Sequence, residues 1–462
     1  MDSKYSEHPD YAAQRSLWQT YRDLYTGGEP LRANAAAYLW RRQREPLDVY
    51  NERLSRVFYE NYIGSIVDWY AATVFRREPL LLTEGDDQAG RAFLGVLAED
   101  CDLRGSSLSE FYRRRLIETL VCGVSYVLVD FPRGQGPAES RAAEEAAGLS
   151  RAYLVEFSPE QVINWNLDDR GNFEWVVVRT TRRYAESPGS RELSEATDWT
   201  YYDRVRFEHR RRIQRGNEPG PLEIVDAGKH ALSVQKRVPL FRLEVPKGLW
   251  LTNKAALLQL EHFNKSNALS WALTMGLFAM PVVYTDREWN QIVGESYYIQ
   301  LGPEDRFGWT EPEGHVFKVA NQNLQRLQEE IYRVCYLLSQ AGGALSSRSL
   351  QSGVSKQRDF AITQEVLRAY GDVVKDSMKA VLRAILEARQ DRLSIDVSGL
   401  DEFDVGEFGN DLADAERLLQ IGIDSPTFRK QVLKKLAFKY LCDVRQDVKD
   451  RIAQEIENGQ SG

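Results

Sequence analysis

The sequence predicts an α+β protein in which long helices and an antiparallel sheet follow one another along the chain. Apolar residues recur at three- and four-residue steps over long stretches without proline, which indicates helices. Between residues 124 and 234 short apolar runs are instead separated by turn residues, which indicates strands. The chain has 462 residues, 43% hydrophobic and 28% charged, which is typical of a globular protein of two to four domains.

In the N-terminal third the pattern is helical. Residues 46–77 carry aromatic or aliphatic side chains every fourth position, from Tyr50 through Tyr62 to Tyr70, so we expect one long helix there. Ser107 and Glu110 have the spacing of a capping box at a helix start. The remaining helices expected in this part are 9–26, 90–101 and 107–120.

The pattern then changes to strands, and the short loops between them favour antiparallel pairing. Arg204–Arg215 is the most basic stretch of the chain. It fits a nucleic-acid patch, or a solvated strand edge protected from aggregation by its cations, and we favour the edge. The expected strands are Val124–Phe131, Ala152–Phe157, Phe173–Thr181, Asp198–Phe207 and a segment around Val225 and Val234.

Two helices flank a small β insert in the second half of the chain. The first helix spans Asn253–Met280 and stops at Pro281, and the second spans Asn321–Ser339. Two helices joined at one end by a compact insert predict a stalk that carries a tip. The strands expected in the insert are Val282–Tyr284, Ser296–Leu301 and His315–Val319.

Ala344–Lys356 is rich in serine and glycine, so we expect a mobile segment with little apolar surface to bury. A long helix follows over Gln357–Arg389. Its two adjoining apolar stripes predict cover on both flanks, inside the subunit or between subunits. Gly371 lies in mid-helix, where glycine costs about 1 kcal/mol against alanine, and predicts a bend or a close contact.

The C-terminal region is predicted to hold short strands and small helices. Ser425 is the expected N-cap of one helix, with Pro426 at its first position. The expected strands are Ser394–Val397 and Glu402–Val405, and the expected helices are Leu412–Leu419, Ser425–Leu436 and Val444–Glu457.

No motif for chemistry is present. The sequence has no phosphate-binding loop, dinucleotide fingerprint, HExxH or GxSxG. Its five histidines lie far apart, and the acidic run 396–414 lacks calcium-loop spacing. We therefore predict no catalytic residue, no metal and no cofactor. Paired carboxylates for acid–base work stay open, because nothing in the sequence singles out a pair.

Composition constrains the setting as well. The four scattered cysteines are expected to be buried free thiols in a reducing compartment: Cys101, Cys122, Cys335 and Cys442. No run of eighteen apolar residues and no signal-peptide core occur, so no membrane association is expected. The net charge of −8 argues against a basic protein that grips DNA, but not against one past which DNA slides.

Several short motifs together resemble the portal proteins of tailed bacteriophages. The most specific is YLVEFSPEQVINW at Tyr153–Trp165. The resemblance spans most of the chain, and the order helix, β insert, helix, mobile loop and long helix agrees with it. The other matching segments are Tyr38-Leu39-Trp40, Tyr50–Leu54, Asn61–Val67 and Val74–Pro79.

The resemblance implies a portal fold with wing, stem, clip, tunnel loop and crown, and a ring of typically twelve subunits at one capsid vertex. The implied parts are a wing (1–250), first stem helix (251–280), clip (281–320), second stem helix (321–340), tunnel loop (341–356), long wing helix with wing strands (357–410) and helical crown (411–462).

It also implies the function and the partners. Double-stranded DNA would pass through the ring during packaging and ejection, contacted without sequence specificity. The terminase large subunit and later head-completion or adaptor proteins would dock on the clip, and the major capsid protein would surround the ring. The protein would be assembled in the host cytoplasm and reside in the virion.

Site residues follow from that architecture, and the stem and clip residues have an alternative role as contacts between subunits. Those expected at the DNA in the tunnel loop are Ser346, Ser347, Arg348, Ser349, Gln351 and Lys356. Those expected along the stem channel are Lys254, His262 and Lys265. Those expected to dock partners on the clip are Glu304, Asp305, Arg306, Trp309 and Glu311.

Two other functions remain open. A different non-enzymatic phage part, such as a minor head or adaptor protein, predicts a smaller assembly and no axial loop. An enzyme with an unrecognised site, such as a nuclease or ADP-ribosyl transferase, predicts a cleft with clustered carboxylates in a monomer or dimer.

Overall fold

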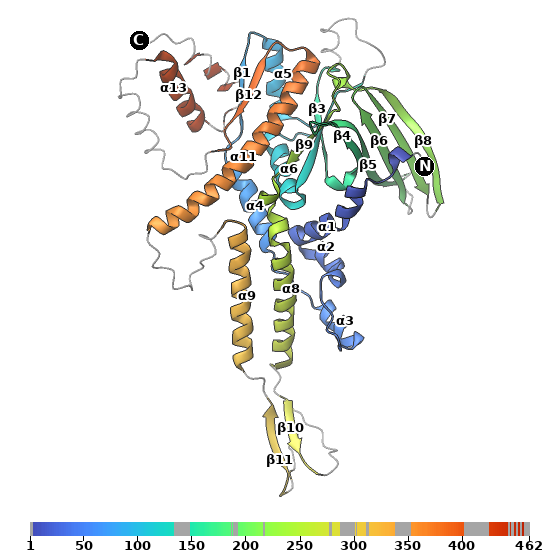
Figure 1. Ribbon diagram of the computed structural model, residues 1–462, viewed down its shortest axis with the longest axis vertical. Coiled ribbons are helices and arrows are strands. Elements are labelled where there is room, and N and C mark those ends of the chain that lie inside the picture. The colour runs from blue at the N-terminus through green and yellow to red at the C-terminus, as the bar shows by residue number, and fades with distance from the viewer. Residues whose placement is uncertain are drawn as a thin grey trace. The chain divides into compact units, whose positions relative to one another are not determined.

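The computed structural model has the mixed α+β architecture that the sequence predicts (Figure 1). It divides into two compact units, a sheet unit (residues 1–22, 66–253 and 360–462) and a two-helix unit (residues 23–65 and 254–359). The described residues are 3–133, 148–185, 187, 193–215, 218–276, 280–286, 301, 303–310, 314–337, 353–401, 425–441, and 444, 448, 449, 451, 452, 455 and 456.

Two antiparallel sheets share one core in the sheet unit. The three-stranded sheet has the order β3-β2-β9 and the five-stranded sheet the order β4-β5-β6-β7-β8, so the predicted antiparallel pairing is confirmed. Tyr126 and Leu128 of β2 pack with Val176 and Val178 of β5 in one buried cluster. The strands are β2 (Val124–Asp130), β3 (Tyr153–Phe157), β4 (Val162–Leu167), β5 (Phe173–Ala185), β6 (Leu193–Asp203), β7 (Arg206–Arg215), β8 (Glu218–Lys229) and β9 (Leu240–Glu244).

The basic stretch does not form a sheet edge, so the favoured interpretation was wrong. β7 pairs with β6 on one side and with β8 on the other. Two of its arginines pair with acids of the same sheet: Arg211 contacts Asp198 at 2.6 Å, and Arg210 contacts Glu208. The outer strand is β8, whose Ile224 is 62% exposed. Sequence composition could not reveal this order, because strand neighbours are a tertiary property.

Helices pack beside these sheets in the same unit, and the predicted capping of one of them is confirmed. The hydroxyl of Ser107 accepts a hydrogen bond from the Glu110 N–H at 3.1 Å at the start of α6. The helices are α1 (Pro9–Thr26), α4 (Tyr62–Val74, shared with the two-helix unit), α5 (Gln88–Glu99) and α6 (Leu108–Cys122).

One small sheet was missed. β1 (Leu80–Glu84) pairs antiparallel with β12 (Ser394–Ser398), which is the strand expected at Ser394–Val397. β1 directly follows the Glu78-Pro79 stop of the predicted helix, and no strand was predicted for its residues. Its partner lies about three hundred residues away, and that pairing leaves no local signal.

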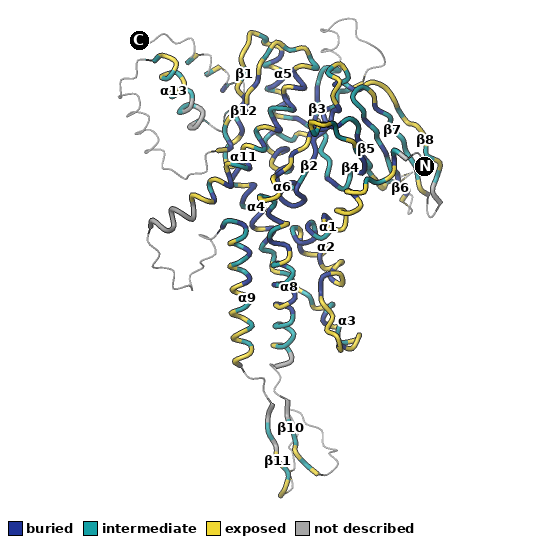
Figure 2. The backbone as a smooth tube through the Cα atoms, viewed as in Figure 1, coloured by how far each residue is buried: buried dark blue, intermediate teal, exposed yellow. Residues whose placement is uncertain are grey.

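The long helix α11 (Gly353–Arg389) has both of its apolar stripes buried, as predicted (Figure 2). Tyr370 and Val381 of one stripe and Met378 of the other are fully buried. That cover comes from the chain itself, so most of both stripes needs no neighbouring subunit. The exceptions are Ile362, which is 53% exposed, and Val373, which is half-buried.

Gly371 marks a close contact of α11. A Cβ placed there would lie 2.0 Å from the Leu400 carbonyl oxygen, so only glycine lets this backbone approach the helix. On the other flank the Tyr370 hydroxyl donates a hydrogen bond to the Leu249 carbonyl at 2.6 Å.

The helix expected over residues 46–77 is in fact two helices, α3 (Leu47–Ser55) and α4. Asn61 explains the break, because its side chain caps α4 by accepting from the Gly64 N–H at 2.7 Å. The Asn267 side chain binds both the N–H and the carbonyl of Phe58, at 3.1 and 2.9 Å. These tertiary hydrogen bonds replace helical ones and override the four-residue periodicity.

Two further expectations changed in position or type. The predicted strand at His315–Val319 is helical, because α9 (Gly314–Val334) begins there and places Val316 and Val319 on an exposed turn. Val234 follows a short 3-10 turn and is 89% exposed, outside β8. The expected strands Ser296–Leu301 and Glu402–Val405 and the expected helix Leu412–Leu419 lie outside the described residues.

In the C-terminal region the predicted cap is confirmed. Ser425 accepts a hydrogen bond from the Phe428 N–H at 3.3 Å at the start of α13 (Pro426–Tyr440), with proline at the first position. Of the helix expected at Val444–Glu457 only isolated positions are described. None of the described helices combines the length and apolarity needed to cross a bilayer.

Candidate functional site: the two-helix unit and its β-hairpin

The two-helix unit is built on an antiparallel helix pair that carries a β-hairpin (Figure 1). α8 (Leu251–Gly276) and α9 are the two helices, and β10 (Met280–Tyr284) pairs antiparallel with β11 (Arg306–Thr310). Three residues separate α8 from β10, and three separate β11 from α9. The hairpin is therefore tied to neighbouring ends of both helices, as the sequence predicts for a tip between two helices.

Two lysines fix the direction of the helix pair. Lys265 of α8 donates to the Asn323 side chain of α9 at 3.1 Å. Eleven residues earlier, Lys254 hydrogen-bonds the Tyr336 hydroxyl, just past the end of α9, and lies 4.2 Å from the centre of that ring. Contacts that advance along one helix and retreat along the other require antiparallel axes.

The stem-channel residues predicted from the sequence sit in three different environments. The Lys254 ammonium is held against Tyr336, and Lys265 also pairs with Glu261 at 2.8 Å. His262 is buried, 2% exposed, with its ring edge-on to Tyr62 at 5.1 Å. An imidazole covered in this way offers DNA no surface. Of the three residues predicted to line the channel, only Lys254 and Lys265 therefore remain candidates.

Burial also sets the charge of His262. Removal from water lowers the pKa of its imidazole, and the negative charge of Glu60 opposes that shift only in part. The neutral ring is thus favoured inside the unit, as expected for a packing residue.

The hairpin carries part of the residues predicted to dock partners. Glu304 and Arg306 are exposed and Asp305 is half-buried. Trp309 lies in β11 opposite Pro281, and its side chain is outside the described residues. Glu311 is also outside them, and the docking role stays a prediction.

The tunnel-loop prediction falls on residues that the structure does not describe. Those residues are Ser346, Ser347, Arg348, Ser349 and Gln351. Lys356 lies in the first turn of α11, and its side chain is outside the described residues.

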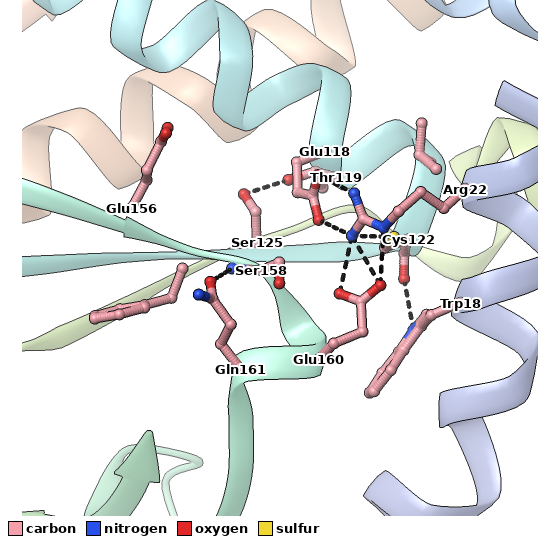
Figure 3. Close-up of polar contacts among 12 residues, drawn as sticks. Trp18, Arg22, Glu118, Thr119, Cys122, Ser125, Glu156, Ser158, Glu160 and Gln161 are labelled. Atoms are coloured by element: carbon pink, nitrogen blue, oxygen red, sulfur yellow. Dashed lines mark hydrogen bonds and ion pairs between the residues drawn. The ribbon is translucent and has the colours of Figure 1, made fainter. Parts of the chain in front are cut away.

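A polar cluster in the sheet unit was missed by sequence reasoning (Figure 3). Arg22 of α1 donates to Glu118 of α6 at 2.7 Å and to Glu160 at 2.8 Å, and it lies 3.6 Å from the Cys122 sulfur. Glu118 and Cys122 are one turn apart on α6, which is the only local signal. Glu160 comes from the short turn between β3 and β4 and could not be placed from sequence.

That turn belongs to the YLVEFSPEQVINW segment, which gives the motif a structural role. Ser158 and Gln161 form a capping box, in which the Gln161 side chain accepts from the Ser158 N–H at 2.8 Å. The turn then presents Glu160 to Arg22, and β4 follows with Val162 and Ile163 fully buried.

The ligand atoms of Glu118, Cys122 and Glu160 lie within 4.8 Å of one another, close enough to hold a metal ion. The Arg22 guanidinium, however, already compensates both carboxylates. Burial, reinforced by the nearby Glu118 charge, raises the pKa of the Cys122 thiol, so a thiolate ligand is disfavoured. We therefore read the cluster as an ion pair that ties α1 to α6.

No protein-family model and no curated protein matches the chain. Among solved structures, a chain from the neck of an empty gene transfer agent particle, computed with C6 symmetry, is 13% identical, with a TM-score of 0.43 over 80% of this chain and 90% of that one. A chain from the virion of a native gene transfer agent particle is 14% identical, with a TM-score of 0.42 over 87% and 98%.

A third similar chain, from the neck of the native particle computed with C12 symmetry, is 13% identical, with a TM-score of 0.39 over 88% and 99%. Similarity at this level does not identify the family of the chain.

Proposed function

We propose that this chain is a portal protein, a non-catalytic subunit of a ring through which double-stranded DNA enters and leaves a phage-like capsid. The observation that carries the proposal is the order of parts: α8, a β-hairpin, antiparallel α9, a serine-rich segment and then α11. This order matches the stem, clip, tunnel loop and wing helix that the sequence resemblance implies.

Charge supports the same role. A duplex carries one negative charge per about 1.7 Å of its axis, so a channel rich in free cations would bind and stall it. The net charge of −8 per chain and the pairing of Arg210 and Arg211 of β7 with acids in their own sheet suit a conduit that DNA slides past. Contacts from the serine-rich segment to phosphate would be non-specific and readily broken.

The proposed setting is one vertex of the virion capsid, inside the shell of major capsid protein. The hairpin would meet the terminase large subunit during packaging and a head-completion or adaptor protein afterwards. Exposed Glu304 and Arg306 would supply polar contacts there. A ring of twelve copies is the expected assembly.

Two measurements test the proposal. Native mass spectrometry and particle images of the purified protein should show a closed ring of order twelve with an axial hole. A small assembly without a hole would favour a minor head or adaptor protein instead.

Deletion of residues 344–353 should leave the ring intact and impair DNA packaging or retention. A deletion of equal length at residues 135–144 (QGPAESRAAE), far from the serine-rich segment in sequence, is the control and should package normally. Normal packaging by the first variant would refute the role of the serine-rich segment.

A further inference from the structure

The segment that follows α2 (Gly28–Ala33) and leads to α3 displays an exposed tryptophan. Tyr38 and Leu39, the first two residues of the Tyr-Leu-Trp segment, are 7% and 3% exposed, whereas Trp40 is 59% exposed. Tryptophan is buried on average in folded proteins, so one held out in solvent calls for a reason. Packing within the chain accounts for Tyr38 and Leu39 but not for Trp40.

The backbone around Trp40 is fixed from both sides. Asn264 of α8 accepts from the Trp40 N–H at 2.8 Å and donates to the Tyr38 carbonyl at 3.0 Å. The Tyr50 hydroxyl of α3 donates to the Leu39 carbonyl at 3.2 Å. Trp40 thus projects from an anchored loop, not from a loose one.

A buried ion pair closes the other end of the loop. Glu45 is 3% exposed in its side chain, and both of its oxygens accept from Arg53, itself 5% exposed, at 2.7 Å. Glu45 also accepts from the Arg42 N–H at 3.1 Å, and its carbonyl accepts from the Arg41 side chain at 2.8 Å. Glu45, the only acidic residue between positions 34 and 46, therefore has its charge neutralised within the chain.

The exposed side chains of the loop and of the first turn of α3 include cationic and apolar groups, alongside Gln43 and Asp48. Arg42 and Arg44 are exposed, and Leu47 at the start of α3 is 58% exposed. We call Trp40, Arg42, Arg44 and Leu47 the Trp40 platform. Tryptophan and arginine are the residue types that dominate the energetics of protein interfaces, and a rigid loop loses little entropy on binding.

We propose that the Trp40 platform is the anchor by which one copy of this chain docks on a second copy. The inference rests on the proposed ring, in which each subunit presents one surface to a different surface of its neighbour. Local charge complementarity favours this occupant, because Arg42 and Arg44 make the platform cationic while the chain as a whole carries 68 acidic against 60 basic residues and so offers acidic surface on a second copy. The exposed indole ring of Trp40 and the methyl groups of Leu47 favour a protein as the partner over a DNA duplex, whose outer surface is a charged phosphate backbone.

The first test measures assembly of the full-length chain against concentration. Trp40→Ala should raise the concentration needed for half-assembly tenfold or more, as expected of an interface anchor. Trp40→Tyr should recover part of the loss, and Glu45→Gln should weaken assembly because it releases the loop. Arg206→Glu, a charge reversal at an exposed position of β7, is the control and should assemble like the unaltered chain.

The second test identifies the occupant directly. A photo-crosslinking amino acid at position 44 is activated in an equal mixture of ¹⁴N- and ¹⁵N-labelled chains, with and without duplex DNA, and the products are mapped by mass spectrometry. Cross-links between light and heavy chains are expected. Cross-links only within one chain, or mainly to DNA, would overturn the inference.

The outcomes separate the two proposals. If the unaltered chain forms rings and Trp40→Ala forms them equally well, the platform is not the anchor, yet the portal proposal stands. If the unaltered chain stays monomeric and gives no cross-link between copies, both proposals fail.

Discussion

Replacing Gly371 by alanine sets two known effects against each other in the middle of α11. Helix propensity alone favours alanine by about 1 kcal/mol. The added Cβ, however, would lie 2.0 Å from the Leu400 carbonyl oxygen and 3.0 Å from its carbonyl carbon. Since nonbonded heavy atoms rest near about 3.5 Å, one backbone must retreat by roughly 1 to 1.5 Å.

That retreat is costly because both partners are confined. Leu400 is 3% exposed, and its φ of 59° places a non-glycine residue in the left-handed region. Overpacking of a well-packed site costs about 1–3 kcal/mol, and here the obstacle is backbone that cannot rotate away. Because backbone is the obstacle, we take the upper part of that range, about 2–3 kcal/mol; less the propensity gain of about 1 kcal/mol, Gly371→Ala should lower the free energy of unfolding by about 1–2 kcal/mol.

Gly95 supplies the matched control, because it lies inside α5 with no atom within 4 Å of an added Cβ. Gly95→Ala should raise the free energy of unfolding by up to about 1 kcal/mol. Urea denaturation followed by circular dichroism measures both variants. Stabilisation of both to the same extent would show that Leu400 does not approach the helix as closely as described.

Three further predictions concern buried groups. Arg22→Met should lower the free energy of unfolding by about 2–4 kcal/mol, because it leaves the Glu118 and Glu160 carboxylates uncompensated; this lies somewhat below the range for fully buried pairs, since Arg22 is 35% exposed. Arg15→Met, which removes the 3.4 Å surface pair with Glu7, should lower it by less than about 1 kcal/mol in the same urea assay. Equal losses in the two variants would contradict the role of the cluster. Burial lowers the pKa of His262 in the folded chain, so as the pH falls the imidazole is protonated in the unfolded chain before it is protonated in the folded one, and the free energy of unfolding should fall below about pH 6.5. His262→Gln should flatten that fall between about pH 6.5 and 5, whereas the control His315→Gln, at an exposed position, should not. An unchanged slope in His262→Gln would refute the burial of a neutral imidazole at this position. Burial raises the pKa of Cys101 and of Cys335 to about 12 and raises that of Cys122 as well. Iodoacetamide at neutral pH should therefore label none of these three thiols before the chain unfolds. Peptide mapping that finds rapid labelling of the folded protein would contradict their burial.

Sequence patterns correctly predicted the features that depend on residues close together in the chain. Ser107 and Ser425 cap helices as expected, because a cap needs only a side chain and an N–H two or three residues away. Between Val366 and Leu386 both stripes of α11 are buried except for the half-buried Val373, because helical periodicity alone defines a face. The three described cysteines are buried free thiols, as their apolar settings indicated.

Three of the failures share one cause, which is a partner distant in sequence. The break before α4 depends on Asn267, more than two hundred residues away, which binds the backbone of Phe58. The interior position of β7 depends on β8 lying outside it. His262 was expected at a channel surface, yet Tyr62 covers its ring.

The sequence by itself determined the order of the parts: two helices around a small β insert, a serine-rich segment and a long doubly striped helix. That order follows from the periods of apolar side chains, which a chain carries before it folds. Only the tertiary structure decided which groups face one another. It placed Arg22 between two glutamates, pressed Leu400 against Gly371 and left Trp40 in solvent, because such contacts depend on burial and hydrogen bonds that distant segments supply together.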